Sequence, residues 1–145
     1  MNQRYFEDVR VGAELPTLVN VPTAVMLFRF SAITWNAHRI HYDREYARSE
    51  GHPDVLVQAH LHGAWLTRVV TDWMGPMGRL AAIDWQNRGR AVPGDVLTCS
   101  GTVKQVAAEG LVGRVQLELS ERNQRGELCV SGAAEVLLPS RGAGT

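Results

Sequence analysis

The stretch Val55-Leu-Val-Gln-Ala-His-Leu-His-Gly-Ala-Trp-Leu-Thr-Arg-Val-Val-Thr-Asp-Trp-Met74 is the longest apolar-rich segment of this chain. Its apolar side chains would cover most of the circumference of a helix, with few charges among them. Such a helix is buried among other elements rather than laid on a surface. Gly75-Pro76 follows directly and ends it, because proline cannot continue a helix. We therefore expect a central buried helix within residues 55–74.

The chain after this helix predicts strands. Along residues 111–121, Val115, Leu117 and Leu119 alternate with polar neighbours, which is the period-2 pattern of a half-buried strand. Four strands are expected after the helix: 80–86, 96–106, 111–121 and 128–138. One buried helix followed by antiparallel strands gives an α+β layer structure, in which the sheet covers the helix.

The chain before the central helix carries a short strand at 14–20 and two shorter helices. Thr23 is the expected N-cap of the first of these helices, which ends near Thr34. Asp43 can cap the second, residues 44–49. The first helix is expected to bury the face that carries its apolar residues at i, i+4 and i+7: Met26, Phe30 and Ile33.

Length and composition describe an ordinary globular domain. The 145 residues, 45% apolar and 21% charged, predict a single domain over 1–145 with 141–145 as a disordered tail. The formal net charge is zero, so nothing indicates a nucleic-acid or anionic-membrane surface. No apolar run has the length of a transmembrane helix and no signal peptide is recognisable, so we expect a cytoplasmic protein. Cys99 and Cys129 are expected to be reduced, and no Cys/His spacing indicates a metal site.

Polar side chains gather in the connection between the two short helices, Trp35-Asn-Ala-His-Arg-Ile-His-Tyr-Asp43. Histidines and asparagines in a loop are, taken alone, more often capping and turn residues than catalysts. This loop, however, is held at both ends by helices, which is where binding and catalytic groups tend to lie. We therefore treat Asn36, His38 and His41 as candidate catalytic residues.

The pattern Phe30-Ser-x-x-Thr-x-Asn-x-His-x-Ile-His-x-Asp43, followed by Tyr46-Ala47, resembles the MaoC-like R-specific enoyl-CoA hydratases and dehydratases of the hot-dog fold. Their signature has an Asp, an Asn two residues later and a His five residues after the Asp. These positions are Asn36, His38 and His41 in this chain, so the spacing is kept while two residue types differ. The run Asn-Ala-His-Arg-Ile-His-Tyr-Asp is similar to the branch of mesaconyl-C4-CoA (3-methylfumaryl-CoA) hydratases. The segment Arg88…Pro93-Gly94-Asp95 also resembles a run of the family.

The resemblance implies a hot-dog fold, with an antiparallel sheet wrapped around the central helix. It also implies a hydro-lyase that acts on a short enoyl-CoA or 3-hydroxyacyl-CoA, whose acyl group could be branched or dicarboxylic. No cofactor is expected apart from the CoA of the substrate. A homodimer or dimer of dimers is expected, because the single sheet leaves an open edge. Two alternatives remain: a hot-dog thioesterase, and a non-catalytic subunit that binds acyl thioesters.

Within this scheme His41 matches the family histidine and titrates in a useful range. Asn36 cannot take a proton and would orient water, and His38 could replace the missing carboxylate as base. The aligned pair Gln58-Ala59 opens the central helix, so the N–H of Ala59 or of a direct neighbour is expected to face the thioester oxygen.

Further substrate-binding residues are expected on the central helix and among the arginines. His60 and His62 stand two residues apart on a helix and cannot both face one site. His60 is retained as a substrate-side candidate. Arg39 and Arg88 are candidates for the CoA phosphates or for an acyl carboxylate, although a solvated ion pair is the default for each.

Overall fold

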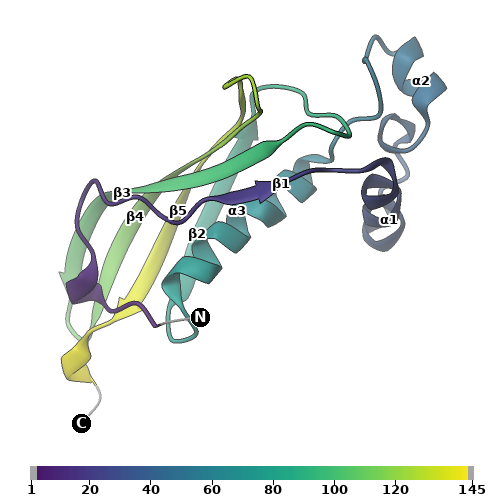
Figure 1. Ribbon diagram of the computed structural model, residues 1–145. Helices are drawn as coiled ribbons and strands as arrows, with labels where there is room; N and C mark the ends of the chain where they lie inside the picture. Colours follow the sequence, from purple (N-terminus) through teal and green to yellow (C-terminus); the bar gives the residue numbers. More distant parts are fainter. Residues whose placement is uncertain (1–2, 144–145) are drawn as a thin grey trace.

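A computed structural model describes residues 3–143 and places a five-stranded antiparallel sheet along one long helix (Figure 1). The helices are α1 (Ala24–Thr34), α2 (Arg44–Ser49) and α3 (Ala59–Met74). The strands are β1 (Leu18–Asn20), β2 (Arg79–Asn87), β3 (Leu97–Glu109), β4 (Val112–Arg122) and β5 (Leu128–Pro139). Short 3-10 turns lie at Phe6–Asp8, Arg39–His41 and Arg141–Ala143. The predicted α+β class is confirmed.

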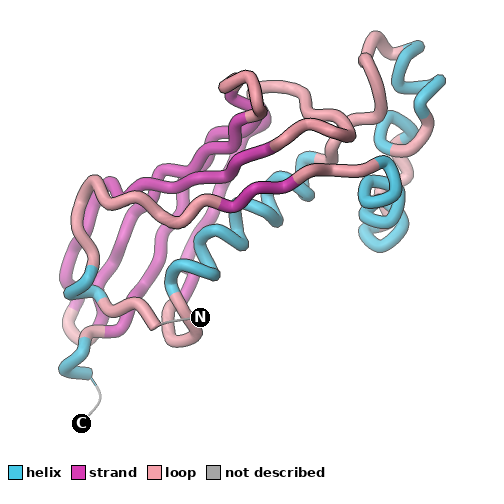
Figure 2. The backbone as a smooth tube through the Cα atoms, viewed as in Figure 1, coloured by secondary structure: helices cyan, strands magenta, loops and turns pink. Residues whose placement is uncertain are grey.

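The strand order is β1-β3-β4-β5-β2, and every neighbouring pair is antiparallel. β2 therefore forms one edge of the sheet, although it follows α3 directly in the chain. The tube drawing shows the strands curling along α3 (Figure 2). In β4 the alternation is confirmed, because Val115, Leu117 and Leu119 are all buried. Cys99 and Cys129 are buried free thiols in β3 and β5.

α3 begins four residues later than the apolar run suggested. Residues 55–57 are extended because their backbone pairs elsewhere: the Leu56 N–H donates to the Ile40 carbonyl, and the Val57 N–H to the Ala91 carbonyl. The helix ends at Gly75, which has φ 78°, as predicted. It is not buried all round, since one stripe is exposed at His60, Ala64, Arg68 and Asp72.

The close approach of α3 to the edge strand depends on Gly63. A Cβ at this position would lie 2.3 Å from the ring of Trp85 on β2, so any larger residue must push the helix from the strand. The indole Nε1 of Trp85 also donates to the Ala59 carbonyl, at 3.1 Å. Helix and edge strand are therefore fixed to each other at the first turn of α3.

α1 lies beyond the end of the sheet (Figure 1). Its predicted cap is confirmed, because the Thr23 hydroxyl accepts from the Met26 N–H. The predicted face is only partly buried: Phe30 packs against the core, but Ile33 is 80% exposed, and the buried positions are Leu27 and Ser31. The reason is that α1 meets the rest of this chain through Leu27, Phe30 and Ser31, which leaves other apolar side chains of the helix exposed.

The end of the chain contacts its beginning. Arg141 lies in the turn Arg141–Ala143, and its Nη2 contacts the Asp8 carboxylate at 2.6 Å. The disordered tail expected over 141–145 is thus ordered at its first three residues, and 144–145 lie outside the described part. Within residues 3–143, no helix combines the length and the apolar character needed to cross a membrane.

Candidate active site

The candidate loop begins with a sharp turn at the end of α1. Trp35 has φ 55°, in the left-handed region, and its N–H donates to the Ser31 carbonyl. The Asn36 N–H donates to the same carbonyl at 2.9 Å. The Asn36 Oδ1 then accepts from the His38 N–H at 3.2 Å. The Asn36 amide nitrogen has no hydrogen-bond partner among residues 3–143.

The structure brings the two loop histidines together. His38 caps the turn Arg39–His41, and its Nδ1 accepts from the Ile40 N–H at 3.4 Å. The rings of His38 and His41 are 5.9 Å apart. His38 is exposed, whereas His41 is only 9% exposed. Because Nδ1 of His38 accepts, the proton of its neutral ring belongs on Nε2, which can donate.

His41 has the opposite tautomer. Its Nδ1 lies 2.8 Å from the Leu56 carbonyl, which can only accept, so Nδ1 carries the proton and Nε2 keeps its lone pair. Burial lowers the pKa of His41, the hydrogen bond to Leu56 opposes this shift, and the neighbouring His38 adds to it. The ring is therefore neutral at pH 7, with Nε2 able to accept a proton.

The Leu56 carbonyl also ties His41 to the N-terminus of α3. Leu56 is two residues before the N-cap Gln58, and its own N–H bonds back to the loop at Ile40. In the described structure the first N–H groups of the helix, those of Ala59 and His60, make no recorded hydrogen bond. Such free donors, reinforced by the helix dipole, suit an oxygen that gains negative charge.

The Gln58 side chain is used inside the fold. It is fully buried, and its Nε2 donates to the Leu27 carbonyl (2.7 Å) and to the Ser31 hydroxyl (2.9 Å). It therefore joins α3 to α1 next to the turn that carries Asn36. Of the predicted pair Gln58-Ala59, only backbone groups remain open toward a substrate.

The two helix histidines point in different directions, as their spacing requires. His60 is exposed and meets Trp85 edge to face, with ring centroids 6.4 Å apart. His62 is buried against the sheet. His60 is thus the histidine of α3 that a ligand at the helix N-terminus could reach.

Arg39 and Asp43 form an ion pair within the loop, with Nη2 and Oδ2 2.6 Å apart. The guanidinium also stacks on Tyr46, 4.5 Å from the ring centroid. The other Asp43 oxygen accepts from the Tyr46 N–H and so caps α2. The backbone bond from Tyr46 and the Arg39 partner lower the pKa of Asp43, which leaves it a poor proton acceptor. The predicted capping role of Asp43 is confirmed.

Arg88 lies away from the histidines, at the end of β2. Its Nε donates to the Ser131 hydroxyl at 2.9 Å. Together with Arg122 and Ser120 it lines a hollow of about 440 Å³ on the outer face of the sheet. No recorded contact in residues 3–143 links it to the loop.

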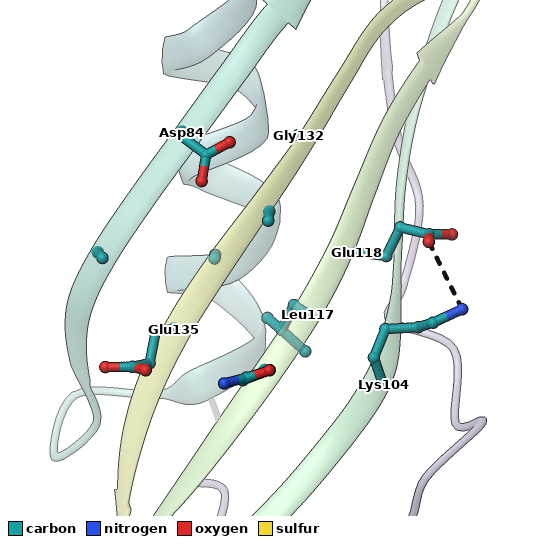
Figure 3. Close-up of a pocket in the computed structure, with 10 residues that line it drawn as sticks. Asp84, Lys104, Leu117, Glu118, Gly132 and Glu135 are labelled. Atoms are coloured by element: carbon teal, nitrogen blue, oxygen red, sulfur yellow. Dashed lines mark ion pairs between the residues drawn. The ribbon is translucent and has the colours of Figure 1, made fainter.

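A neighbouring hollow of about 390 Å³ lies on the same outer face, with α3 behind the sheet (Figure 3). Its charged side chains include Asp84, Glu135 and Glu118, the last paired with Lys104 at 3.5 Å. This acidic surface carries no histidine and is a poor match for the phosphates of CoA.

A third hollow, of about 330 Å³, lies beside the candidate loop. Asn36 forms part of its wall, and its other lining is mostly apolar: Phe28, Ala32, Trp35, Ala37 and Tyr42. Of the hollows described, this one adjoins the catalytic candidates.

Two supporting groups were missed at the level of sequence. The Leu56 carbonyl orients His41, and the Ser31 hydroxyl accepts a hydrogen bond from the Gln58 side chain. The residue types alone predict neither role. Ser31 does stand within the quoted Phe-Ser pattern, which was the one available signal.

A family model described as hydroxyacyl-thioester dehydratase type 2 matches residues 16–93, more than half of the chain. A mesaconyl-C(4)-CoA hydratase of Chloroflexus aurantiacus is 60% identical over 42 residues, which are 28% of this chain and 15% of that protein. The beta subunit of a 3-oxo-4,17-pregnadiene-20-carboxyl-CoA hydratase of Mycobacterium tuberculosis is 29% identical over 102 residues, 70% of this chain and 78% of that subunit.

Among solved structures, the R-hydratase PhaJ1 of Pseudomonas aeruginosa superimposes with a TM-score of 0.84 at 21% identity, covering 94% of this chain and 86% of that one. This likeness confirms the hot-dog fold. The matched part of this chain spans only 15% of the Chloroflexus relative, so that protein's activity does not pass to it directly. On fold and family match together, the chain belongs to the hydroxyacyl-thioester dehydratase type 2 family of MaoC-like hot-dog proteins.

Proposed function

We propose that the protein is a hydro-lyase that adds water reversibly to a short enoyl-CoA thioester. The observation that carries the proposal is the Leu56 carbonyl, which holds His41 as a neutral base directly before the free N-terminus of α3. Base and oxyanion donors are thus joined by a few residues of one backbone. The family match supports this reaction class.

In the proposed reaction, Nε2 of His41 takes a proton from water as the water oxygen attacks Cβ. The electrons of the double bond move toward Cα and the thioester oxygen, which the Ala59 and His60 N–H groups stabilise. The proton that Nε2 of His41 has taken is then delivered to Cα, which returns His41 to its neutral form. The side-chain amide of Asn36 orients the water. No cofactor beyond the CoA of the substrate takes part.

Two acyl groups are supported by different observations. The hollow beside Asn36 is mostly apolar and favours an unbranched or branched hydrocarbon chain. The name of the Chloroflexus relative supports a mesaconyl group instead, whose carboxylate would need a cation. Arg39 is the nearest candidate, but Asp43 and Tyr46 already engage it. We therefore place crotonyl-like substrates before dicarboxylic ones.

The proposed assembly is a homodimer or a dimer of dimers, with the site between chains. β2 is a nine-residue edge strand, and such an edge can pair antiparallel with its own copy. The outward face of α1 adds exposed apolar side chains that a partner could cover: Val25 (67%), Phe28 (59%), Ile33 (80%) and Trp35 (91%).

The test is incubation with crotonyl-CoA, mesaconyl-C4-CoA and butyryl-CoA, following enoyl absorbance and free thiol together. Loss of absorbance without thiol release is the expected result. Thiol release from any of the three would show a thioesterase. Binding without either signal would show a non-catalytic subunit. Arg141→Ala, at the opposite end of the molecule, is the control and should behave as the parent.

A further inference from the structure

A buried polar pair lies under the first turn of α3. Nδ1 of His62 is 2.7 Å from Oε1 of Glu121 on β4, and the two side chains are 2% and 0% exposed. Neither atom forms a hydrogen bond in the described structure, so this approach is a close polar contact. Each is therefore the other's polar neighbour, in a region otherwise packed with apolar residues of α3 and the sheet.

The second oxygen of Glu121 is held from the sheet. Cys99 lies directly opposite Glu121 in the β3–β4 ladder, and its Sγ donates to Oε2 at 3.3 Å. Burial, together with the adjacent Glu121 carboxylate, raises the pKa of the Cys99 thiol far above its usual range, so it stays protonated and remains a donor. The carboxylate is thus fixed between β3 on one side and α3 on the other.

This pair is not what stability alone would select. Removing two polar groups from water is costly, and well-packed apolar residues in place of a buried ion pair are often as stable or more stable. Leu66 and Val70 on the same helix show that apolar residues fill this interface without difficulty. The polar pair differs from them in fixing one rotation of the helix, because a displaced helix would leave both groups without a partner.

The helix turn that the pair fixes is the one that carries the oxyanion donors. His62 is three residues after Ala59, so any rotation or shift of His62 moves the Ala59 and His60 N–H groups with it. The Trp85 bond to the Ala59 carbonyl and the Gln58 bonds to α1 hold the same turn from other directions. The His62–Glu121 pair supplies the attachment to the centre of the sheet.

We propose that His62 and Glu121 are positioning residues for hydration, whose buried contact sets the aim of the Ala59 and His60 N–H groups at the thioester oxygen. This inference rests on the proposed function and adds two residues to it. Neither side chain touches the substrate. Their loss therefore weakens the transition state, in which the oxygen gains charge, more than it weakens ground-state binding.

The test compares two substitutions of similar size at one position. Glu121→Met removes the polar partner of His62, and kcat should fall about 10²-fold with KM unchanged, the usual effect of a small misplacement. Glu121→Gln keeps a polar partner in the same shape, and kcat should stay within about threefold of the parent. If Glu121→Met keeps the kcat of the parent, or if Glu121→Gln is as slow as Glu121→Met, the proposal is overturned.

A stability control and a second variant keep the test decisive. Val70→Ala, on the same helix and also fully buried, should lower the melting temperature without lowering kcat well below that temperature. A parallel loss of kcat in Val70→Ala would reduce the effect to general destabilisation and overturn the proposal. If Glu121→Met does not fold, the double variant His62→Leu/Glu121→Met replaces it with the same expectation. A parent that hydrates no enoyl-CoA would instead contradict the proposed function itself.

Discussion

At the scale of single residues, the chemistry depends on the protonation state of His41. Its pKa is lowered chiefly by burial, from a model-peptide value of 6.5. Base catalysis requires the neutral ring, so kcat/KM should rise with pH through an inflection below 6.5 and be level at pH 7. The unfolded chain binds this proton more readily, so folding stability should also decrease as pH falls below 6.5 toward the folded-state pKa.

Measuring kcat/KM at about ten pH values, from about pH 4.5 to about pH 8, checks this expectation. An inflection well above 6.5 would mean that His41 is not the base.

Asn36 offers a second prediction at this scale. Asn36→Asp keeps the oxygen that accepts from the His38 N–H and restores the aspartate of the wider family's spacing. Its negative charge should raise the pKa of His41, if the two side chains lie within about 6 Å, and move the acidic limb of the profile upward. Activity should be kept or increased, whereas Asn36→Ala should be impaired because water loses its orienting amide.

The comparison of the two Asn36 variants is made by steady-state kinetics on the preferred substrate. An inactive but folded Asn36→Asp would show that the amide nitrogen donates a hydrogen bond that a carboxylate cannot give. Asn36 would then belong with the donors to the thioester oxygen.

The sequence pointed to the candidate residues of this loop but not to the groups that support them. His38 and His41 were selected by their residue type and by their spacing, both of which can be read directly from the sequence. The Leu56 carbonyl that sets the tautomer of His41 could not be found this way, since any residue carries a carbonyl. The inward use of the Gln58 side chain was missed for a similar reason, because its partners come from a different helix.

At the scale of elements, the contact between α3 and β2 is limited by Gly63. Gly63→Ala places a Cβ against the Trp85 ring and should cost about 1–3 kcal/mol of unfolding free energy. Gly142→Ala, where a Cβ meets nothing within 4 Å, is the matched control and should change stability by less than about 0.5 kcal/mol. Urea unfolding measures both, and equal stabilities would contradict the close approach.

Element boundaries show what periodicity can and cannot give. The four strands after α3 and the caps at Thr23 and Asp43 followed from local patterns and were confirmed. The first strand is shorter than predicted, Leu18–Asn20 in place of 14–20. The start of α3 was not predicted correctly. Residues 55–57 are apolar, but their backbone N–H groups bond to Ile40 in the loop and to Ala91, so they are extended and not helical. The exposure of Ile33 was not foreseen, because an apolar stripe predicts burial without saying what covers it.

At the scale of the whole molecule, the exposed stripe of α1 and the free edge of β2 predict self-association. Sedimentation at micromolar concentration should show a dimer or a dimer of dimers. Ile33→Asp should weaken the assembly, because it places a charge in the apolar stripe. Val11→Asp is the control, since Val11 is also exposed (61%) but lies outside α1, next to Gly12, whose N–H bonds to the Val103 carbonyl of β3. A stable monomeric parent would contradict a site shared between chains.

The central claim is that His41, held by Leu56 before the N-terminus of α3, performs the hydration. The most direct measurement is the rate of enoyl-absorbance loss for the parent and for His41→Ala, with circular dichroism to verify that both are folded. The variant should lose about 10²–10⁴-fold in kcat, the usual contribution of a general acid–base group. A folded His41→Ala as active as the parent would contradict the claim.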